Sequence, residues 1–174
     1  MGWYHGVHLL TVVSPDGLLT GYGCAPAATA EQVVAETLLA VRAQPPQPQP
    51  RLPEVGQPVA AGLYLADTGF EGQRWQPHWR HDYAALVLTP PKAHQPFPVA
   101  WPPGLRRAFA GWRQIVETVH AKLLGVFRLA SERPHTLAGL RARLAAMVAL
   151  HNFCCWLNRR LGRPLLAFAD LLDW

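Results

Sequence analysis

The chain has few charged residues and few cysteines for its length of 174 residues. Only 16% of the residues are charged and 50% are hydrophobic, which excludes a globally disordered protein and leaves enough apolar side chains for a sizeable core. Three cysteines, two of them adjacent, make no disulfide framework, so we expect a reducing, cytoplasmic setting. The length fits one domain or an incomplete piece of a larger one.

Long apolar runs are also lacking. The longest mainly apolar stretch, 144–157, is interrupted by His151 and Asn152 and is shorter than the roughly 20 residues that span a bilayer. Residues 1–5 contain no basic segment followed by an apolar one. We therefore expect no transmembrane helix, no signal peptide and no membrane partner.

The positive charge is concentrated in the C-terminal part of the chain. Residues 1–100 carry five Lys/Arg against seven Asp/Glu, whereas residues 101–174 carry eleven against four. This asymmetry favours an anionic partner, of which nucleic acid is the commonest, although the signal is weak on its own.

Prolines are concentrated in two blocks, with six in residues 43–58 and six in residues 90–103. Such segments favour extended, semi-rigid connectors, so we expect two linkers without a core of their own. The remaining pattern predicts the order β, β, α, linker, β, α, β, linker, α, α, which is an α/β fold.

The segments before the first linker predict a hairpin and a helix. A strand over 4–13 ends at a turn over 14–17, and a second strand follows over 18–24. Thr29 is expected to cap a helix over 30–42. The apolar face of that helix is predicted to contain Val33, Val34, Thr37, Leu38 and Val41.

The segments between the linkers predict a buried strand over 62–66, a short helix over 71–79 and a strand over 84–89. Two long helices are predicted after the second linker, over 105–124 and 136–161, the last being stopped by Gly162 and Pro164. The buried face of the last helix is predicted to contain Leu137, Leu140, Leu144, Met147, Val148, His151 and Cys155.

Two acidic residues stand where metal chemistry could occur. Asp67 follows the strand over 62–66, and ligands bind outside the carboxyl ends of strands in α/β sheets. Glu117 lies mid-helix in a polar stripe with Arg106, Arg113 and His120. Position alone leaves ordinary alternatives open: a turn or helix cap for Asp67, and a solvated Arg113–Glu117 pair.

Histidines and cysteines give weaker indications. His78 and His81 could share a helical face in an unrelated zinc hydrolase, but nothing in the sequence completes such a site. His151 with Cys154 or Cys155 is better explained by core packing than by zinc binding.

Four segments, in this order, resemble the catalytic domain of bacterial DDE-type insertion-sequence transposases, which has an RNase H-like fold. They are the run Trp3-Tyr4-His5-Gly6-Val7-His8-Leu9-Leu10, the run Leu65-Ala66-Asp67-Thr68-Gly69-Phe70, the run Arg113-Gln114-Ile115-Val116-Glu117-Thr118-Val119, and the closing segment from Arg141-Ala142-Arg143-Leu144 to Ala149-Leu150-His151-Asn152. The resemblance extends over nearly the whole of residues 1–174 apart from the two proline blocks.

The resemblance implies an RNase H-like mixed sheet flanked by helices and incomplete at the N-terminus, with the first strand and its catalytic aspartate missing. Asp67 and Glu117 would be the second and third acids that hold Mg²⁺ or Mn²⁺, which catalyse phosphoryl transfer in pairs about 3.5–4 Å apart. The lysine that often lies seven residues after the glutamate is replaced by Leu124. We expect the chain to be inactive alone.

The partners implied are transposon-end and target DNA, together with a second copy or a separately encoded N-terminal half. The residues expected to contact DNA are Arg106, Arg113, His120, Arg141, Arg143, Arg159 and Arg160. The alternative is a transposase remnant that binds DNA or protein without catalysis.

Overall fold

A computed structural model describes residues 6–44, 60–91, 101–131, 134–169 and 171 of the chain. Most of both proline blocks and the start of the first predicted strand lie outside these residues. The chain divides into two compact units, one built from residues 1–10 and 22–103 and the other from residues 11–21 and 104–174. The fold class is mixed α/β, as the sequence predicted.

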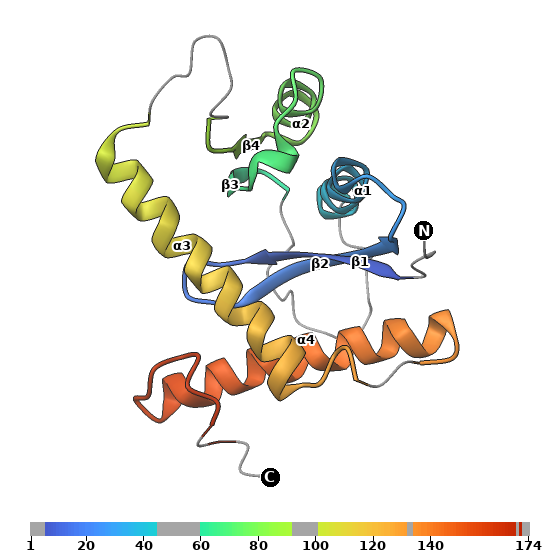
Figure 1. Cartoon of the computed structure of the whole chain (residues 1–174), viewed down its shortest axis with the longest axis vertical. Helices are drawn as coiled ribbons and strands as arrows, with labels where there is room; N and C mark the ends of the chain where they lie inside the picture. Colours follow the sequence, from blue (N-terminus) through green and yellow to red (C-terminus); the bar gives the residue numbers. More distant parts are fainter. Residues whose placement is uncertain (1–5, 45–59, 92–100, 132–133, 170, 172–174) are drawn as a thin grey trace, which may run out of the picture. The chain divides into compact units, whose positions relative to one another are not determined.

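A β-hairpin contributes to both units (Figure 1). Strand β1 (Val7–Val13) pairs with strand β2 (Leu19–Pro26), and the turn at Ser14 is closed by bonds between Ser14 and Leu18. Gly17 takes a φ of 85°, a conformation that favours glycine in such a turn. None of the seven β1 residues is fully buried, and among the described residues β2 is the only strand paired with β1.

Helix α1 (Glu31–Ala43) packs in the first unit, but with a different face from the one predicted. Its N-cap is Ala30 without a side-chain bond, so the expected Thr29 cap is wrong. Val34 and Leu39 are the buried positions, whereas Val33 and Val41 are exposed. The helix is rotated because its contacts with α2 and η1, distant in sequence, decide which side is covered.

A β-α-β unit forms the rest of the first unit. Strand β3 (Gly62–Leu65) pairs in parallel with strand β4 (Ala85–Leu88), and the 3-10 helix η1 (Thr68–Phe70) and helix α2 (Trp75–Tyr83) connect them. Helix α2 packs against β4 and α1. The core consists of Leu39, Ala60, Trp79, Ala85 and Val87.

Among the described residues of the first unit, only one face of this parallel pair is covered. Ala85 and Val87 are buried, whereas Leu63 and Leu86, which are register partners, are 61% and 42% exposed. The expectation of a buried strand over 62–66 is wrong, because Gly62 and Leu63 are exposed and the other residues of β3 are only partly buried. The predicted helix over 71–79 is also displaced, since α2 begins at Trp75 and ends at Tyr83.

The second unit contains two long helices. Helix α3 (Pro103–Ala121) continues into the π-helical turn η2 (Lys122–Val126), and helix α4 (Leu137–Arg160) follows. Thr136 caps α4 by accepting a bond from the Gly139 amide, and Gly162 after its end has a φ of 67°. The predicted limits of both helices are thus confirmed to within a few residues.

The buried side of α4 holds the hairpin turn and the C-terminal segment. Asn152 bonds both the amide and the carbonyl of Leu19, at 2.9 and 2.8 Å. Cys154, Cys155 and Phe168 form a buried cluster on the same side. Leu137 was predicted to be buried but is 59% exposed, because it lies in the first turn of the helix beyond this packing.

Candidate functional site

Asp67 lies immediately after β3, at the carboxyl end of a parallel strand. It caps η1, since its Oδ1 accepts a hydrogen bond from the Gly69 amide at 2.8 Å. The side chain is exposed, and Oδ2 accepts no hydrogen bond from the residues that the structure describes. The capping role does not exclude metal binding, because a carboxylate can offer its second oxygen to an ion.

A second carboxylate approaches the same turn. A methyl group added at Gly69 would lie 2.9 Å from Oε2 of Glu31 and 3.0 Å from Oδ1 of Asp67. The neighbouring Gln32 donates a hydrogen bond to the Gly69 carbonyl. The first turn of α1 therefore meets the end of β3 at Gly69, a relationship that no motif in the sequence indicated.

Glu117 lies in the second unit, on the exposed side of α3. Its Oε1 accepts a hydrogen bond from Nε of Arg113 at 2.9 Å, and both side chains are more than 60% exposed. This is the i, i+4 pair that position alone favoured. Within the described residues, no group of three or more His, Cys, Asp or Glu side chains is arranged to hold a metal ion.

The residues expected to contact DNA differ in their surroundings. Arg106, Arg141 and Arg160 are exposed. Arg143 is partly buried and donates from Nη2 to the Arg128 carbonyl at 2.9 Å, while Arg159 bonds Asp16 at 3.2 Å. These last two side chains therefore have structural contacts within their own unit.

His120 has an intramolecular partner in the second unit. Its Nε2 lies 2.8 Å from the Thr11 hydroxyl, and burial lowers the pKa of the imidazole. A neutral imidazole carries no charge to attract phosphate.

A carboxylate network occupies the interface between α1 and α2. The Glu36 carboxylate accepts hydrogen bonds from Nε1 of Trp79 at 2.8 Å and from the Tyr83 hydroxyl, and lies 3.1 Å from Nε2 of His78. Burial raises the pKa of Glu36, but the bonds from Tyr83, His78 and Trp79 outweigh it and hold the pKa below its usual range. The bond to Glu36 raises the pKa of Tyr83 to about 12.

His78 belongs to this network and not to a zinc site. Its Nδ1 lies 2.8 Å from Asp82, so both ring nitrogens face carboxylates. His81 is 89% exposed and contacts the neighbouring Asp82. The pairing of His78 with His81 as zinc ligands finds no support in this arrangement.

His151 is completely buried and packs as a core residue. Its Nε2 lies 2.9 Å from the Gly17 carbonyl and 3.7 Å from Sγ of Cys155. Burial lowers the pKa of His151 against the opposing effect of the Gly17 bond. Burial also raises the pKa of the Cys154 thiol and, together with Cys154, that of Cys155 to about 11, so the nucleophilic thiolate form is disfavoured at both.

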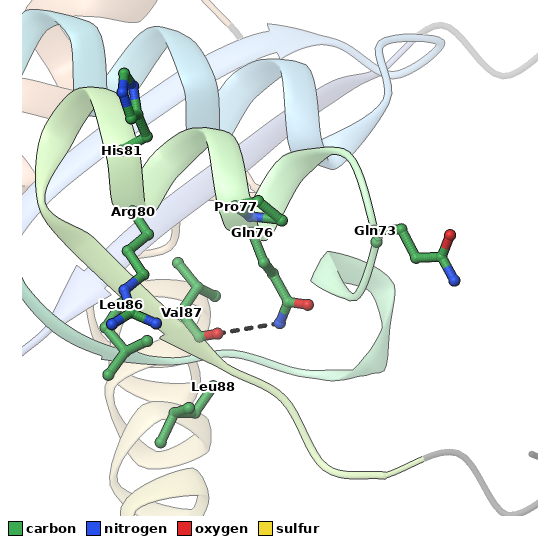
Figure 2. Close-up of a pocket in the computed structure, with 9 residues that line it drawn as sticks. Gln73, Gln76, Pro77, Arg80, His81, Leu86, Val87 and Leu88 are labelled. Carbon is green, nitrogen blue, oxygen red and sulfur yellow. Dashed lines mark hydrogen bonds between the residues drawn. The ribbon is translucent and has the colours of Figure 1, made fainter. Parts of the chain in front are cut away.

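A pocket in the first unit lies between α2 and the open side of β4 (Figure 2). Gln76 bonds the Val87 carbonyl at 3.0 Å and so caps the outer edge of β4, while Arg80 extends past Leu86. Neither Asp67 nor any residue expected to contact DNA is among the lining residues. They are Gly72, Gln73, Gln76, Pro77, Arg80, His81, Leu86, Val87 and Leu88.

Comparison with known proteins adds no relative. No family model, no curated protein and no solved structure matches the chain. No helix among the described ranges is both long enough and apolar enough to cross a membrane.

Proposed function

We propose that the chain is the C-terminal part of a DDE-type transposase catalytic domain, acting on DNA in the cytoplasm. The observation that carries the proposal is Asp67, an exposed carboxylate at the carboxyl end of a parallel strand. The order of hairpin, helix, strand, helix, strand and two long helices is consistent with an RNase H-like domain. In this reading a further strand N-terminal to β1 supplies β1 with a second neighbour and brings the first aspartate.

The metal would be Mg²⁺ or Mn²⁺, held by Asp67, Glu117 and the aspartate of that further strand. The capping bond of Asp67 uses Oδ1, so Oδ2 is available to an ion. The pair with Arg113 uses Oε1 of Glu117, so Oε2 is available. Hard divalent ions prefer such oxygens, and two ions would stabilise the attacking and leaving oxygens of the phosphodiester. The exposed arginines of α3 and α4 would bind phosphates without reading sequence.

The alternative is a transposase remnant that binds DNA without cutting it. It is favoured by the structural use of both acids, since Asp67 caps η1 and Glu117 pairs with Arg113. In that case neither carboxylate is needed for binding, and the arginines alone would carry the affinity.

The decisive experiment combines the chain with the polypeptide encoded immediately upstream of Met1. Duplexes taken from the DNA that flanks the coding sequence are incubated with both polypeptides and Mn²⁺, and nicks are mapped on both strands. The transposase reading predicts nicks at fixed positions that require both polypeptides and disappear with Asp67→Asn or Glu117→Gln. Binding without nicking, unchanged in those variants, would establish the remnant instead.

A further inference from the structure

The side of α4 turned away from the core is apolar and exposed. It carries Leu150 at 41%, Phe153 at 54% and Trp156 at 54% exposure. The remaining members of this surface, which we call the α4 outer face, are the exposed Ala142, Ala145, Ala146 and Ala149. Apolar surface of this extent is unusual on a helix that already buries its opposite side.

The α4 outer face has the spacing of a helix-packing surface. Positions 142, 146, 149, 153 and 156 alternate in steps of four and three, which at 100° per residue keeps them within about 80° of one another. Leu144, Met147 and His151 occupy the opposite, buried side. The alanines leave room for another backbone to approach closely. Phe153 and Trp156 protrude beyond them at the C-terminal end of the face.

The two aromatic side chains are already arranged for contact. The rings of Phe153 and Trp156 stack with centroids 5.6 Å apart and planes 29° apart. Because each side chain fixes the other, binding would cost little additional side-chain entropy. Exposed aromatic residues held in this way are typical anchors of protein interfaces.

The charge around the face indicates an acidic partner. Helix α4 contains Arg141, Arg143, Arg159 and Arg160 and no acidic residue. Arg141 and Arg159 fall at the same angle along one border of the face, where Arg159 also pairs with Asp16 at 3.2 Å. Arg160 follows Trp156 at the C-terminal end of the helix, in line with the middle of the face. A second copy would bring arginines against arginines in either orientation, because they lie at both ends of the helix.

A nucleic acid would complement the charge of the arginines but not the apolar side chains of the α4 outer face. Bases could stack on Phe153 and Trp156, but a strand would leave the alanines and Leu150 in contact with water. An amphipathic helix with acidic borders would cover the apolar side chains of the α4 outer face and also pair with the arginines. We propose that the α4 outer face binds such a helix from another protein. This interaction does not depend on the proposed transposase chemistry, although Arg141 and Arg160 are also proposed to bind DNA phosphate.

The test uses a fluorescein-labelled synthetic helix with leucine at the a and d positions of a few heptads and glutamate at e and g. Glutamate at these positions hinders the peptide from pairing with itself. Fluorescence anisotropy measures its binding to the full chain. We expect Phe153→Ala/Trp156→Ala to weaken binding at least about ten-fold. A peptide with lysine in place of glutamate should bind at least about ten-fold more weakly.

Leu137→Ala is the matched control, because Leu137 is an exposed apolar residue of α4 that lies off the face. Its affinity for the peptide should equal that of the unchanged chain, and circular dichroism confirms that each variant is folded. Equal binding by the double variant, or by the lysine peptide, would overturn the proposal. Two other results would also overturn it. One is oligothymidine binding that the double variant loses, and the other is dimerisation in light scattering that the double variant loses. In either case the proposal fails if the peptide binds both chains equally or binds neither.

Discussion

The Glu36 carboxylate accepts a hydrogen bond of 2.8 Å from the indole of Trp79, which is completely buried. This bond joins α1 to α2 across 43 residues of sequence. The Tyr83 hydroxyl donates a hydrogen bond to the same carboxylate, and Nε2 of His78 lies 3.1 Å from it. One partly buried carboxylate thus meets the polar atoms of three side chains on α2.

Replacing Glu36 with glutamine should destabilise the protein by about 2 kcal/mol, because the amide offers a weaker acceptor and places an NH₂ group against donors. Denaturant unfolding measures the change. Glu117→Gln is the matched control, since it removes the same charge from an exposed pair and should change the free energy of unfolding by no more than about 0.5 kcal/mol. Equal effects of the two substitutions would contradict the structural role of Glu36.

Stability should fall as the pH decreases from about 7.5 to 5.5. Burial lowers the pKa of His151 and of His120 in the folded state, so the unfolded chain binds protons first as the pH falls below 6.5. The folded state is therefore fully favoured above this pH and progressively less favoured below it. Free energies of unfolding measured across the range should show this slope.

The histidine variants test the origin of that slope. His151→Gln should lower stability at pH 7.5, because the Gly17 bond and the packing of the ring are lost, but should flatten the pH dependence. His135→Gln replaces an exposed histidine and should leave the slope as it is in the unchanged chain. An undiminished slope in His151→Gln would assign the effect to other groups.

Two glycine substitutions should act in opposite directions. An added methyl at Gly17 would lie 2.9 Å from a Leu166 methyl, and its φ of 85° disfavours any other residue, so Gly17→Ala should cost about 2–4 kcal/mol. Gly111 lies inside α3 with nothing within 4 Å of an added methyl. Gly111→Ala should therefore stabilise the protein by about 0.5–1 kcal/mol in thermal or denaturant unfolding.

Substitutions at Asp67 separate its capping role from its proposed metal role. Asparagine keeps an oxygen for the Gly69 amide, so Asp67→Asn should retain stability, whereas Asp67→Ala should lose about 1 kcal/mol. Both should abolish the Mn²⁺-dependent nicking expected of the completed transposase domain. Nicking that survives in Asp67→Asn would remove Asp67 from the metal site without affecting its role as a cap.

The arginines of α4 should bind DNA through phosphate contacts. Arg141→Ala and Arg160→Ala should each reduce the slope of log affinity against log salt by about 0.9 on any duplex sequence. Arg80→Ala, which removes an exposed arginine of the first unit, is the control and should leave the slope unchanged. Fluorescence anisotropy at several salt concentrations measures all three.

Local chemistry in the sequence determined the elements and several of their limits. The turn with Gly17, the Thr136 cap and the stop at Gly162 each depend on residues within a few positions, so they could be predicted without any knowledge of packing. The positions of Asp67 after a strand and Glu117 within a helix follow from the same local signals.

Only the tertiary structure decided which faces are covered. The apolar positions of α1 were compatible with more than one face. Leu39 is buried in the core that contains Trp79 of α2, and Val34 is buried near Gly23 of β2, whereas Val33 and Val41 are exposed. The partners of Glu36 and the Gly17 carbonyl that His151 meets lie 42 or more residues away in the chain, so no local pattern could indicate them. Periodicity shows that a helix has an apolar side, but burial depends on contacts between segments that the sequence does not bring together until the chain folds.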